Sequence, residues 1–268
     1  MRRIKPQDSR ADAVIPIIRF SAEFEKILSR AEGGTGAKNL RQKQKSDKIS
    51  LTMILYHGSP NKIVVPQFGL GQDRHDYGKG FYLTQDLNLA KEWAVCRPET
   101  ESGYVHSFEF DAAGLNIFDY EKENILCWLS ELMKHRDAAD SKRYRMLAAK
   151  FIEKFGKDTS NADVIKGWRA NASYFYIAKA FVRDEVDIDI LEELMQLGGL
   201  GIQWCVKSEK AFDRLKETAE PIPVDWREFN AKYNERDADA RNKMKALIDS
   251  DKNKVTKVFS TLVAEESK

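Results

Sequence analysis

The chain has 268 residues, which is long enough for one large domain or two small ones with a sizeable core. Its 44 Lys+Arg residues nearly balance 42 Asp+Glu residues, so the net charge of +2 gives no reason to expect a protein that coats nucleic acid. No apolar run approaches the ~20 residues of a membrane-spanning helix, and the N-terminus lacks the apolar stretch of a secretory signal. Three cysteines without a CxxC pair favour reduced thiols over disulfides or structural zinc, so we expect a cytoplasmic protein without a metal.

The positive charge is concentrated at the N-terminus. Residues 1–52 hold 12 Lys/Arg and 6 Asp/Glu, a net +6, which leaves −4 of the chain's +2 for residues 53–268. One short helix is predicted over 21–31, with Ser21 as its N-cap, and a flexible basic linker follows it. We expect residues 1–52 to form a basic, partly disordered arm, which is either a poorly ordered leader or an arm that binds a partner.

From Met53 the sequence is typical of a globular domain. An apolar piece at 62–68 and a Gly/Asp-rich loop at 69–80 separate the first two strands. Strands are predicted at 53–59, 80–84, 104–111, 162–171 and 202–208. Helices are predicted at 86–96 with Asp86 as N-cap, at 121–135 and 141–156, in two pieces broken near 184–187, and at 208–217 with Ser208 as N-cap.

The order of these elements predicts the fold class. Strands are interrupted by unrelated helices without regular βαβ alternation, which favours an α+β fold over a doubly wound sheet. Residues 53–220 form the expected domain. Residues 221–268 read as a charged helical tail, and we expect it to be mostly solvated.

Three short segments, far apart in the sequence, are candidates for a functional site. Residues 56–59, Tyr-His-Gly-Ser, place an imidazole beside a glycine whose bare backbone a ligand can approach closely. Residues 78–84, Gly-Lys-Gly-Phe-Tyr-Leu-Thr, are a double-glycine turn that leads into a strand with an aromatic ring. Residues 203–206, Gln-Trp-Cys-Val, form a strand after a glycine-rich loop. Taken singly, each also fits a plain turn, hairpin or core strand.

Together and in this order, the three features resemble the ADP-ribosyltransferase superfamily, in the branch of poly(ADP-ribose) polymerases and diphtheria-like toxins. That branch has a His-Gly at one strand end, a G-x-G-ϕ-Tyr at the next strand, and a catalytic acid at the start of a late strand. A second ring follows eleven residues after the tyrosine, as Trp93 follows Tyr82. The likeness is closest to compact, largely uncharacterised bacterial members, and it covers roughly residues 53–216. It implies two small packed antiparallel sheets that form an NAD cleft, with inserted helices.

The resemblance implies a role for each residue, with NAD as a substrate and no metal. Gly58 would pair its main chain with the nicotinamide carboxamide, and His57 would bind a ribose hydroxyl. Tyr82 would stack on the nicotinamide ring, and Trp93 would close the other side. The implied catalytic residues are His57, Tyr82 and Gln203, and the implied NAD-binding residues are His57, Gly58, Ser59, Arg74, Gly80, Tyr82 and Trp93.

The chain departs from the family at Gln203, where polymerising members have Glu. An amide brings no negative charge and cannot act as a base, so chain elongation is not expected. Transfer of one ADP-ribose would then need a good acceptor nucleophile or a carboxylate from elsewhere. Asp73 and Asp76 are candidates for that carboxylate, and Glu209 is a weaker one.

Several other residues have quieter interpretations. His75 either contacts the adenosine half or is a solvated loop residue, and His106 is expected to be structural. His135 suits a helix C-terminus, and Cys205 is expected to face the core. The ends of the strand at 164–168 offer two further residues that could reach the cleft, Asp163 and Asn171.

These expectations combine into one function. The resemblance implies a mono-ADP-ribosyltransferase, a glycosyltransferase that releases nicotinamide. It further implies a bacterial toxin or phage-defence effector with a protein or nucleic-acid acceptor, an antitoxin or chaperone partner and no membrane. The alternatives are a catalytically degenerate NAD or ADP-ribose binding module, an NAD glycohydrolase, and an enzyme directed at RNA or DNA, which the basic arm modestly supports.

Overall fold

The computed structural model describes residues 52–97, 101–136, 141–170, 172–196, 201–251 and 257–264. These residues all lie in one unit that spans 49–268. The basic arm and its predicted helix at 21–31 lie outside the described residues, and so does Asn171. None of the described helices combines the length and apolar character that a bilayer crossing requires.

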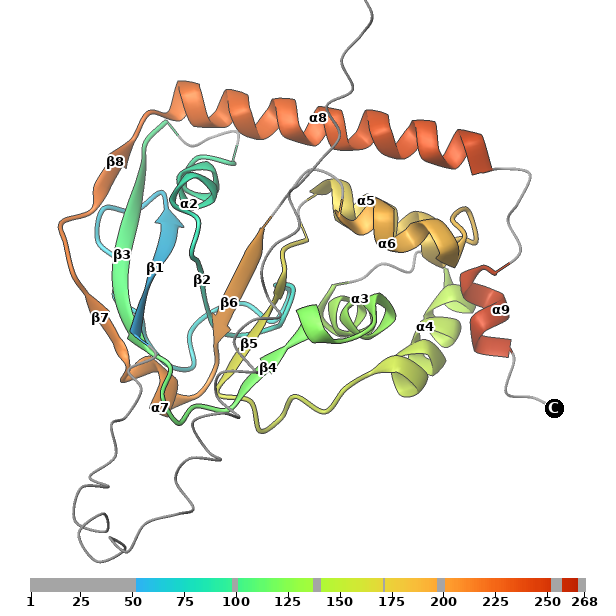
Figure 1. Cartoon of the computed structure of the whole chain (residues 1–268), viewed down its shortest axis with the longest axis horizontal. Helices are drawn as coiled ribbons and strands as arrows, with labels where there is room; N and C mark the ends of the chain where they lie inside the picture. Colours follow the sequence, from blue (N-terminus) through green and yellow to red (C-terminus); the bar gives the residue numbers. More distant parts are fainter. Residues whose placement is uncertain are drawn as a thin grey trace, which may run out of the picture. The chain divides into compact units, whose positions relative to one another are not determined.

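Within this part of the chain, eight strands form one mixed sheet in the order β4-β5-β6-β2-β1-β3-β7, with β8 also beside β3 (Figure 1). All paired neighbours are antiparallel except β4 and β5, which are parallel. The strands are β1 (Thr52–Ser59), β2 (Phe81–Thr84), β3 (Gly103–Asp111), β4 (Ile117–Asp119), β5 (Val164–Trp168), β6 (Ile202–Val206), β7 (Leu215–Glu217) and β8 (Ile222–Val224). The five predicted strands are confirmed as β1, β2, β3, β5 and β6, whereas the three-residue strands β4, β7 and β8 were not among them.

The expectation of two separate antiparallel sheets is corrected, because one continuous sheet connects all the strands. The connection is narrow: β1 and β2 share a single residue pair, Tyr56 with Thr84. Beyond that pair the His57 side chain lies between the strands, and its Nδ1 is 2.8 Å from the Tyr82 carbonyl oxygen. The imidazole thus bonds to the Tyr82 carbonyl oxygen, which would accept from a backbone N–H of β1 if the ladder continued. The two strands separate from this point.

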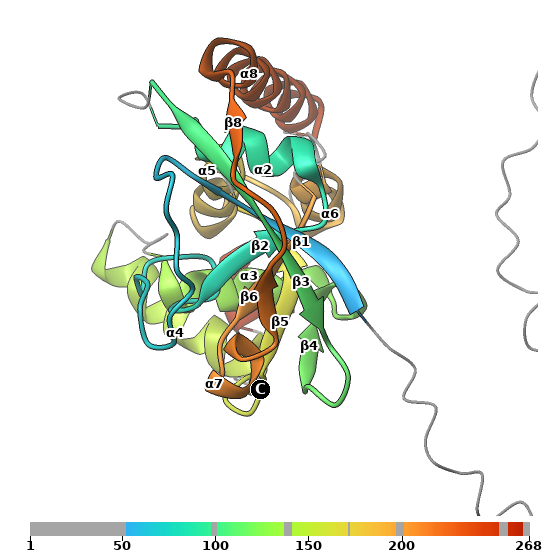
Figure 2. The ribbon, with the colours of Figure 1, turned by 90° about the vertical axis from the view of Figure 1, so that its left-hand side faces the viewer.

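The two halves of the sheet face each other across a shared core. Leu55, Phe108 and Phe110 come from the β1–β3 half and pack in one cluster with residues of the other half. The rings of Phe110 and Trp204 meet edge to face at 6.5 Å between centroids. Figure 2 shows β1 and β3 running obliquely across β2 and β6, which is the arrangement that brings these inner faces together. The α+β class is therefore confirmed, with a bent single sheet.

Eight α-helices and one short 3₁₀-helix are present in the described part. The N-caps predicted at Asp86 and Ser208 are confirmed by bonds from their side chains to helix N–H groups. The predicted helix at 208–217 is too long, because its second half is β7. The helices are α2 (Leu87–Ala94), η1 (Tyr120–Lys122), α3 (Ile125–His135), α4 (Lys142–Phe155), α5 (Ala172–Val182), α6 (Ile188–Gln196), α7 (Glu209–Phe212), α8 (Trp226–Asp251) and α9 (Phe259–Ala264).

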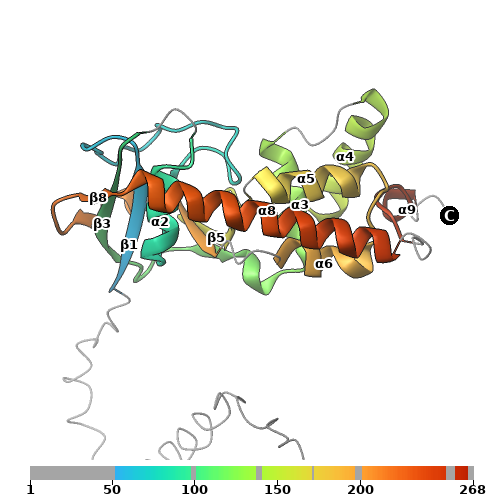
Figure 3. The same ribbon diagram turned by 90° about the horizontal axis from the view of Figure 1, so that it is seen from above.

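The C-terminal region is helical as predicted, but it is more deeply packed than a solvated tail. Helix α8 runs over α2 at one end and over α5 and α6 further along (Figure 3). It buries a narrow stripe of Phe229, Ala240 and Met244 inside an otherwise charged sequence. Phe259 of α9 is fully buried against Phe151 of α4, with ring centroids 5.0 Å apart. This region therefore completes the core and holds α2 in place.

Candidate functional site

A cleft of about 680 Å³ opens beside the point where β1 and β2 separate. It is lined by the end of β1, the start of β2, helix α2, and the residues that follow α3 and β5. All the residues that the sequence predicted to be catalytic or NAD-binding line this one cleft. Their roles remain predictions. These residues are His57, Gly58, Ser59, Arg74, Gly80, Tyr82, Trp93 and Gln203.

His57 is held as a neutral imidazole. Its Nδ1 faces a carbonyl oxygen, which can only accept a hydrogen bond, so Nδ1 donates and Nε2 keeps its lone pair. The ring stacks on Phe81 at 4.4 Å between centroids. Burial lowers the pKa of His57 to about 4, and the nearby His106 adds to this, while the bond to Tyr82 opposes it. At neutral pH, Nε2 is therefore an acceptor suited to a hydroxyl donor.

Gly58 is required by packing as well as by its exposed backbone. Continuing the pairing of Tyr56 with Thr84 would place Gly58 opposite Tyr82, and the ladder ends before it. A Cβ at Gly58 would lie 2.0 Å from the Ala90 carbonyl oxygen and 2.7 Å from the Ala94 nitrogen. Only glycine therefore allows α2, which carries Trp93, to approach the cleft edge of β1 so closely.

Tyr82 forms part of the cleft wall and also organises the loop before β2. Its hydroxyl donates to the Gly78 carbonyl at 2.6 Å and accepts from the Tyr77 N–H at 3.0 Å. The His75 ring lies 5.2 Å from the Tyr82 ring. Burial raises the pKa of Tyr82 far above its ordinary value, so the hydroxyl stays protonated. The ring is a neutral aromatic wall, as a stacking role requires.

Gln203 meets a carboxylate that the sequence alone did not pair with it. Its Nε2 donates to Asp76 Oδ2 at 2.9 Å and to the Trp168 carbonyl at 3.2 Å. Both amide hydrogens are thus used, and Oε1 remains as the acceptor in the cleft wall. Asp76 Oδ2 also accepts from the Ala170 N–H at 2.8 Å, and Asp76 Oδ1 lies 2.9 Å from Arg136 Nη1. Of the candidate carboxylates, Asp76 is the one that the structure places beside Gln203.

The other candidate acids lie elsewhere. Asp73 is 75% exposed and pairs with Lys79 at 3.7 Å, so it does not enter the cleft. Glu209 lines a different groove. Asp163, which the sequence offered as a residue that could reach the cleft, does not line it, because its carboxylate accepts from Ser208 Oγ at 2.6 Å and from the Asn116 N–H at 2.8 Å. Asp163 instead links the residues just before β4 and β5 to the N-cap of α7.

The remaining histidines and Cys205 fall where the sequence indicated. His75 is exposed and lines the cleft. His106 is fully buried and bonds Glu217 Oε1 at 3.0 Å and the Asn61 carbonyl at 3.1 Å, which is a structural role. His135 is the last residue of α3. Cys205 is fully buried, and burial raises the pKa of its thiol to about 12.

Three arginines in the cleft were missed by sequence reasoning. Arg97 follows α2, Arg136 follows α3, and Arg169 follows β5, and all three line the cleft. Their only sequence signal is a position just after a core element, which the chain's 44 Lys+Arg residues obscure. With Arg74, they give the cleft four arginines against one lining carboxylate, Asp76. The cleft is therefore basic, although residues 53–268 carry a net negative charge.

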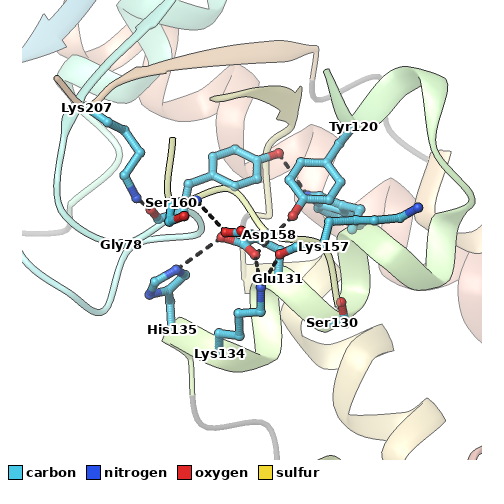
Figure 4. A network of polar contacts seen from close by, with 12 residues as sticks. Gly78, Tyr120, Ser130, Glu131, Lys134, His135, Lys157, Asp158, Ser160 and Lys207 are labelled. Carbon is cyan, nitrogen blue, oxygen red and sulfur yellow. Dashed lines mark hydrogen bonds and ion pairs between the residues drawn. The ribbon is translucent and has the colours of Figure 1, made fainter. Parts of the chain in front are cut away.

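A second groove, of about 570 Å³, lies at the end of α3 (Figure 4). Glu131 is its centre: Oε2 accepts from Lys134 at 2.7 Å and from the Tyr120 hydroxyl at 3.0 Å, and Oε1 bonds His135 at 3.3 Å. Burial opposes ionisation, but the bonds from His135, Lys134 and Tyr120 outweigh it and lower the pKa of Glu131 to about 2. Lys207 donates to the Tyr77 carbonyl at 2.7 Å, which anchors the loop that carries Asp76. This network is structural, and it holds one wall of the cleft.

The fold and the cleft together define an α+β protein with a polar cleft at a split in its sheet. Residues 53–216 match the family described as "Protein of unknown function (DUF3990)", and since this is more than half of the chain, the protein belongs to that family. No curated protein and no solved structure matches the chain. Among the described residues, no group of three or more His, Cys, Asp and Glu side chains is arranged to hold a metal ion. The function is therefore argued from the cleft.

Proposed function

We propose that the protein is a mono-ADP-ribosyltransferase that uses NAD as its donor substrate. The observation that carries the proposal is the early end of the β1–β2 ladder, which puts an imidazole acceptor, a bare glycine backbone and two aromatic rings around one cleft. The family description assigns no activity. The support is therefore the match between these groups and the needs of a nicotinamide nucleotide.

Each part of the donor has a fitting group. Gly58 is paired with Val105 of β3 but lies beyond the last β1–β2 pair, and on that open side its main chain would offer an N–H and a carbonyl to a carboxamide, while His57 Nε2 offers a lone pair to a ribose hydroxyl. The rings of Tyr82 and Trp93 supply stacking, which is worth ~0.5–1.5 kcal/mol beyond burial for an aromatic pair. One face of Trp93 is already covered by the Arg169 guanidinium at 4.6 Å, so a ligand ring has the other face.

The reaction breaks the bond between the nicotinamide nitrogen and C1′ of the ribose, and both bonding electrons leave with neutral nicotinamide. Positive charge develops on the ribose, and a lone pair of the acceptor then forms the new bond to C1′ while its proton passes to solvent. Asp76 polarises Gln203 through the 2.9 Å bond, which makes Oε1 a stronger acceptor for a ribose hydroxyl. Asp76, which is itself ion-paired with Arg136, thus fixes the orientation of Gln203 and strengthens its acceptor oxygen.

The acceptor and the biological setting are further parts of the proposal. A toxin or phage-defence role, with an antitoxin or chaperone partner in the cytoplasm, follows only from the resemblance. An NAD glycohydrolase that uses the same cleft is the second candidate. A water molecule replaces the acceptor nucleophile in that reaction.

Purified full-length protein, NAD labelled in the adenylate half and a bacterial lysate test the proposal. We expect released nicotinamide and a labelled macromolecule, and digestion with protease or nuclease then identifies the acceptor class. Nicotinamide without a labelled acceptor indicates the glycohydrolase, and bound NAD without nicotinamide indicates a binding module. Absence of NAD binding overturns all three.

A further inference from the structure

Two polar atoms in residues that line the cleft are buried without a hydrogen-bond partner. They are Trp93 Nε1 and Arg169 Nη1, and the Arg169 guanidinium lies over the Trp93 ring at 4.6 Å. Arg236 of α8 also has an orphan nitrogen, but its guanidinium is paired with Glu92. Arg169 has no ion pair with any described residue. Its charge is therefore only partly compensated, by groups such as Asp76 that form no ion pair with it, and its Nη1 is a buried donor without a partner.

Two of the three neighbouring arginines also lack an ion pair with a described residue. Arg136 is neutralised by Asp76 at 2.9 Å, whereas Arg74 and Arg97 have no ion pair among the described residues. The charges of Arg97 and Arg136 both reach His75, where they act with burial to lower its pKa, and Asp76 opposes them. Three positive charges thus converge on the cleft after the one lining carboxylate has been matched.

A charge that is taken out of water without a partner is costly, and a guanidinium cannot escape the cost by losing its proton under ordinary conditions. The Arg169 guanidinium is already removed from water when the protein folds. An anion that enters the cleft therefore gains the attraction to this cation without a further cost of desolvating it. The planar fork of arginine matches the oxygens of a phosphate group in two-point contact. The incompletely compensated charge of Arg169, together with Arg74 and Arg97, therefore favours a phosphate-bearing ligand over a neutral one.

We propose that Arg169, with Arg97 and Arg74, forms an anion subsite in the cleft that binds the pyrophosphate of a dinucleotide. Trp93 is the positioning residue of this subsite, because its ring fixes the plane of the Arg169 guanidinium. The identification of the ligand as NAD rests on the proposed function. The subsite itself requires only a pyrophosphate group, as ADP or inorganic pyrophosphate also carries.

Calorimetry with the full chain tests the subsite, using ADP, inorganic pyrophosphate and adenosine as probes. Arg169→Gln should weaken ADP and pyrophosphate binding by roughly tenfold to a hundredfold, the range of charge-assisted hydrogen bonds, and leave adenosine binding unchanged. Arg169→Lys keeps the charge but loses the fork, so its loss should be intermediate. Arg214→Gln is the matched control, because Arg214 pairs with Asp111 at 3.0 Å outside the cleft.

Arg97→Gln keeps the test decisive if Arg169→Gln does not fold, because the Arg97 side chain is exposed and its loss should also weaken ADP more than adenosine. An unchanged ratio of ADP to adenosine affinity in folded variants overturns the subsite, and so does a wild type that binds neither ADP nor pyrophosphate. Arginine-dependent ADP binding without any NAD binding keeps the subsite and overturns the proposed function. NAD turnover together with an unchanged ratio of ADP to adenosine affinity supports the proposed function and overturns the subsite.

Discussion

The cleft beside β1 and the groove at the end of α3 have similar volumes, about 680 and 570 Å³, and opposite polar chemistry. In the groove, Glu131 is matched by three donors, and Lys134 and Lys207 each donate to a protein oxygen. In the cleft, His57 Nε2 and Gln203 Oε1 have no hydrogen bond to a described residue, and Arg169 Nη1 is an orphan. Polar groups without a described protein partner, rather than cavity size, distinguish the cleft from the groove.

The largest expected effect is the loss of activity from the cleft aromatic and the imidazole. We expect His57→Ala and Tyr82→Ala each to lower kcat/KM for nicotinamide release by roughly a hundredfold or more, because the donor loses its fixed orientation. Lys157→Met is the matched groove variant, since Lys157 pairs with Glu123 at 2.8 Å away from the cleft. A chromatographic nicotinamide assay measures all three. Equal rates in the cleft and groove variants would contradict the distinction between the two regions.

The Asp76–Gln203 pair allows a charge-swap experiment. Asp76→Asn should lower kcat roughly a hundredfold with a smaller change in KM, since Gln203 Oε1 loses the polarisation and the fixed orientation that act on the developing cation. Gln203→Glu alone places two carboxylates in contact, so one keeps its proton and the rate becomes pH-dependent. The double variant should recover rate relative to Asp76→Asn. If the pair has only a structural role, the losses of rate in the two single variants should add in the double variant. Steady-state kinetics as a function of pH distinguishes these two outcomes.

Gly58→Ala tests whether the cleft depends on the close approach of α2. The added methyl would lie 2.0 Å from the Ala90 carbonyl oxygen, so α2 must shift. We expect a destabilisation of about 1–3 kcal/mol from overpacking, together with weaker NAD binding because Trp93 moves with the helix. Thermal unfolding and calorimetry give the two values. Wild-type affinity in a destabilised variant would show that α2 does not shape the site.

Glu131→Gln should lower stability without weakening NAD binding, in contrast to Gly58→Ala, which should lower both. The variant loses charge-assisted bonds and should cost about 1–3 kcal/mol, with NAD affinity nearly unchanged. Because the pKa of Glu131 is lowered to about 2, its contribution is present above pH ~4.5 and is lost as the pH falls toward 2. The variant should lack this acid dependence in urea unfolding curves. A parallel dependence in both proteins would exclude Glu131 as its source.

The smallest expected effect is the pH dependence from His57. Its pKa of about 4 lies below the ordinary value, so the imidazole is neutral from pH 6 upward and NAD affinity should be flat there. Below that range the ring takes up a proton, and both the stability it contributes and the acceptor at Nε2 are lost as the pH falls toward 4. Affinity measured from pH 4 to 8 tests this. A midpoint near 6.5 would contradict the buried neutral imidazole.

The sequence predicts the local features well because they depend on neighbouring residues. The strands at His57 and Tyr82 and the cap at Asp86 follow from alternation, glycine breaks and capping chemistry. The edge strands β7 and β8 have three residues each, and they exist through pairing with β3, which no local pattern encodes. The two-sheet expectation failed for a similar reason, since a single residue pair joins the halves.

The same division applies to the site. Motifs nominated the residues at the strand ends, and the structure brings them to one cleft. The bond between Asp76 and Gln203 joins positions 127 residues apart, so the sequence supplied Asp76 only as one of several acids. Arg169 had no signal, because an arginine after a strand looks like any exposed cation until its burial and missing partner are seen.

The most direct test is nicotinamide release from NAD by the wild-type full chain and by Tyr82→Ala, measured side by side after both are shown to be folded. The account predicts release by the wild type and loss of release when the ring that lines the cleft is removed. Release that is equal in the two proteins would contradict the assignment of this cleft, and no release and no NAD binding by the wild type would contradict the proposed activity itself.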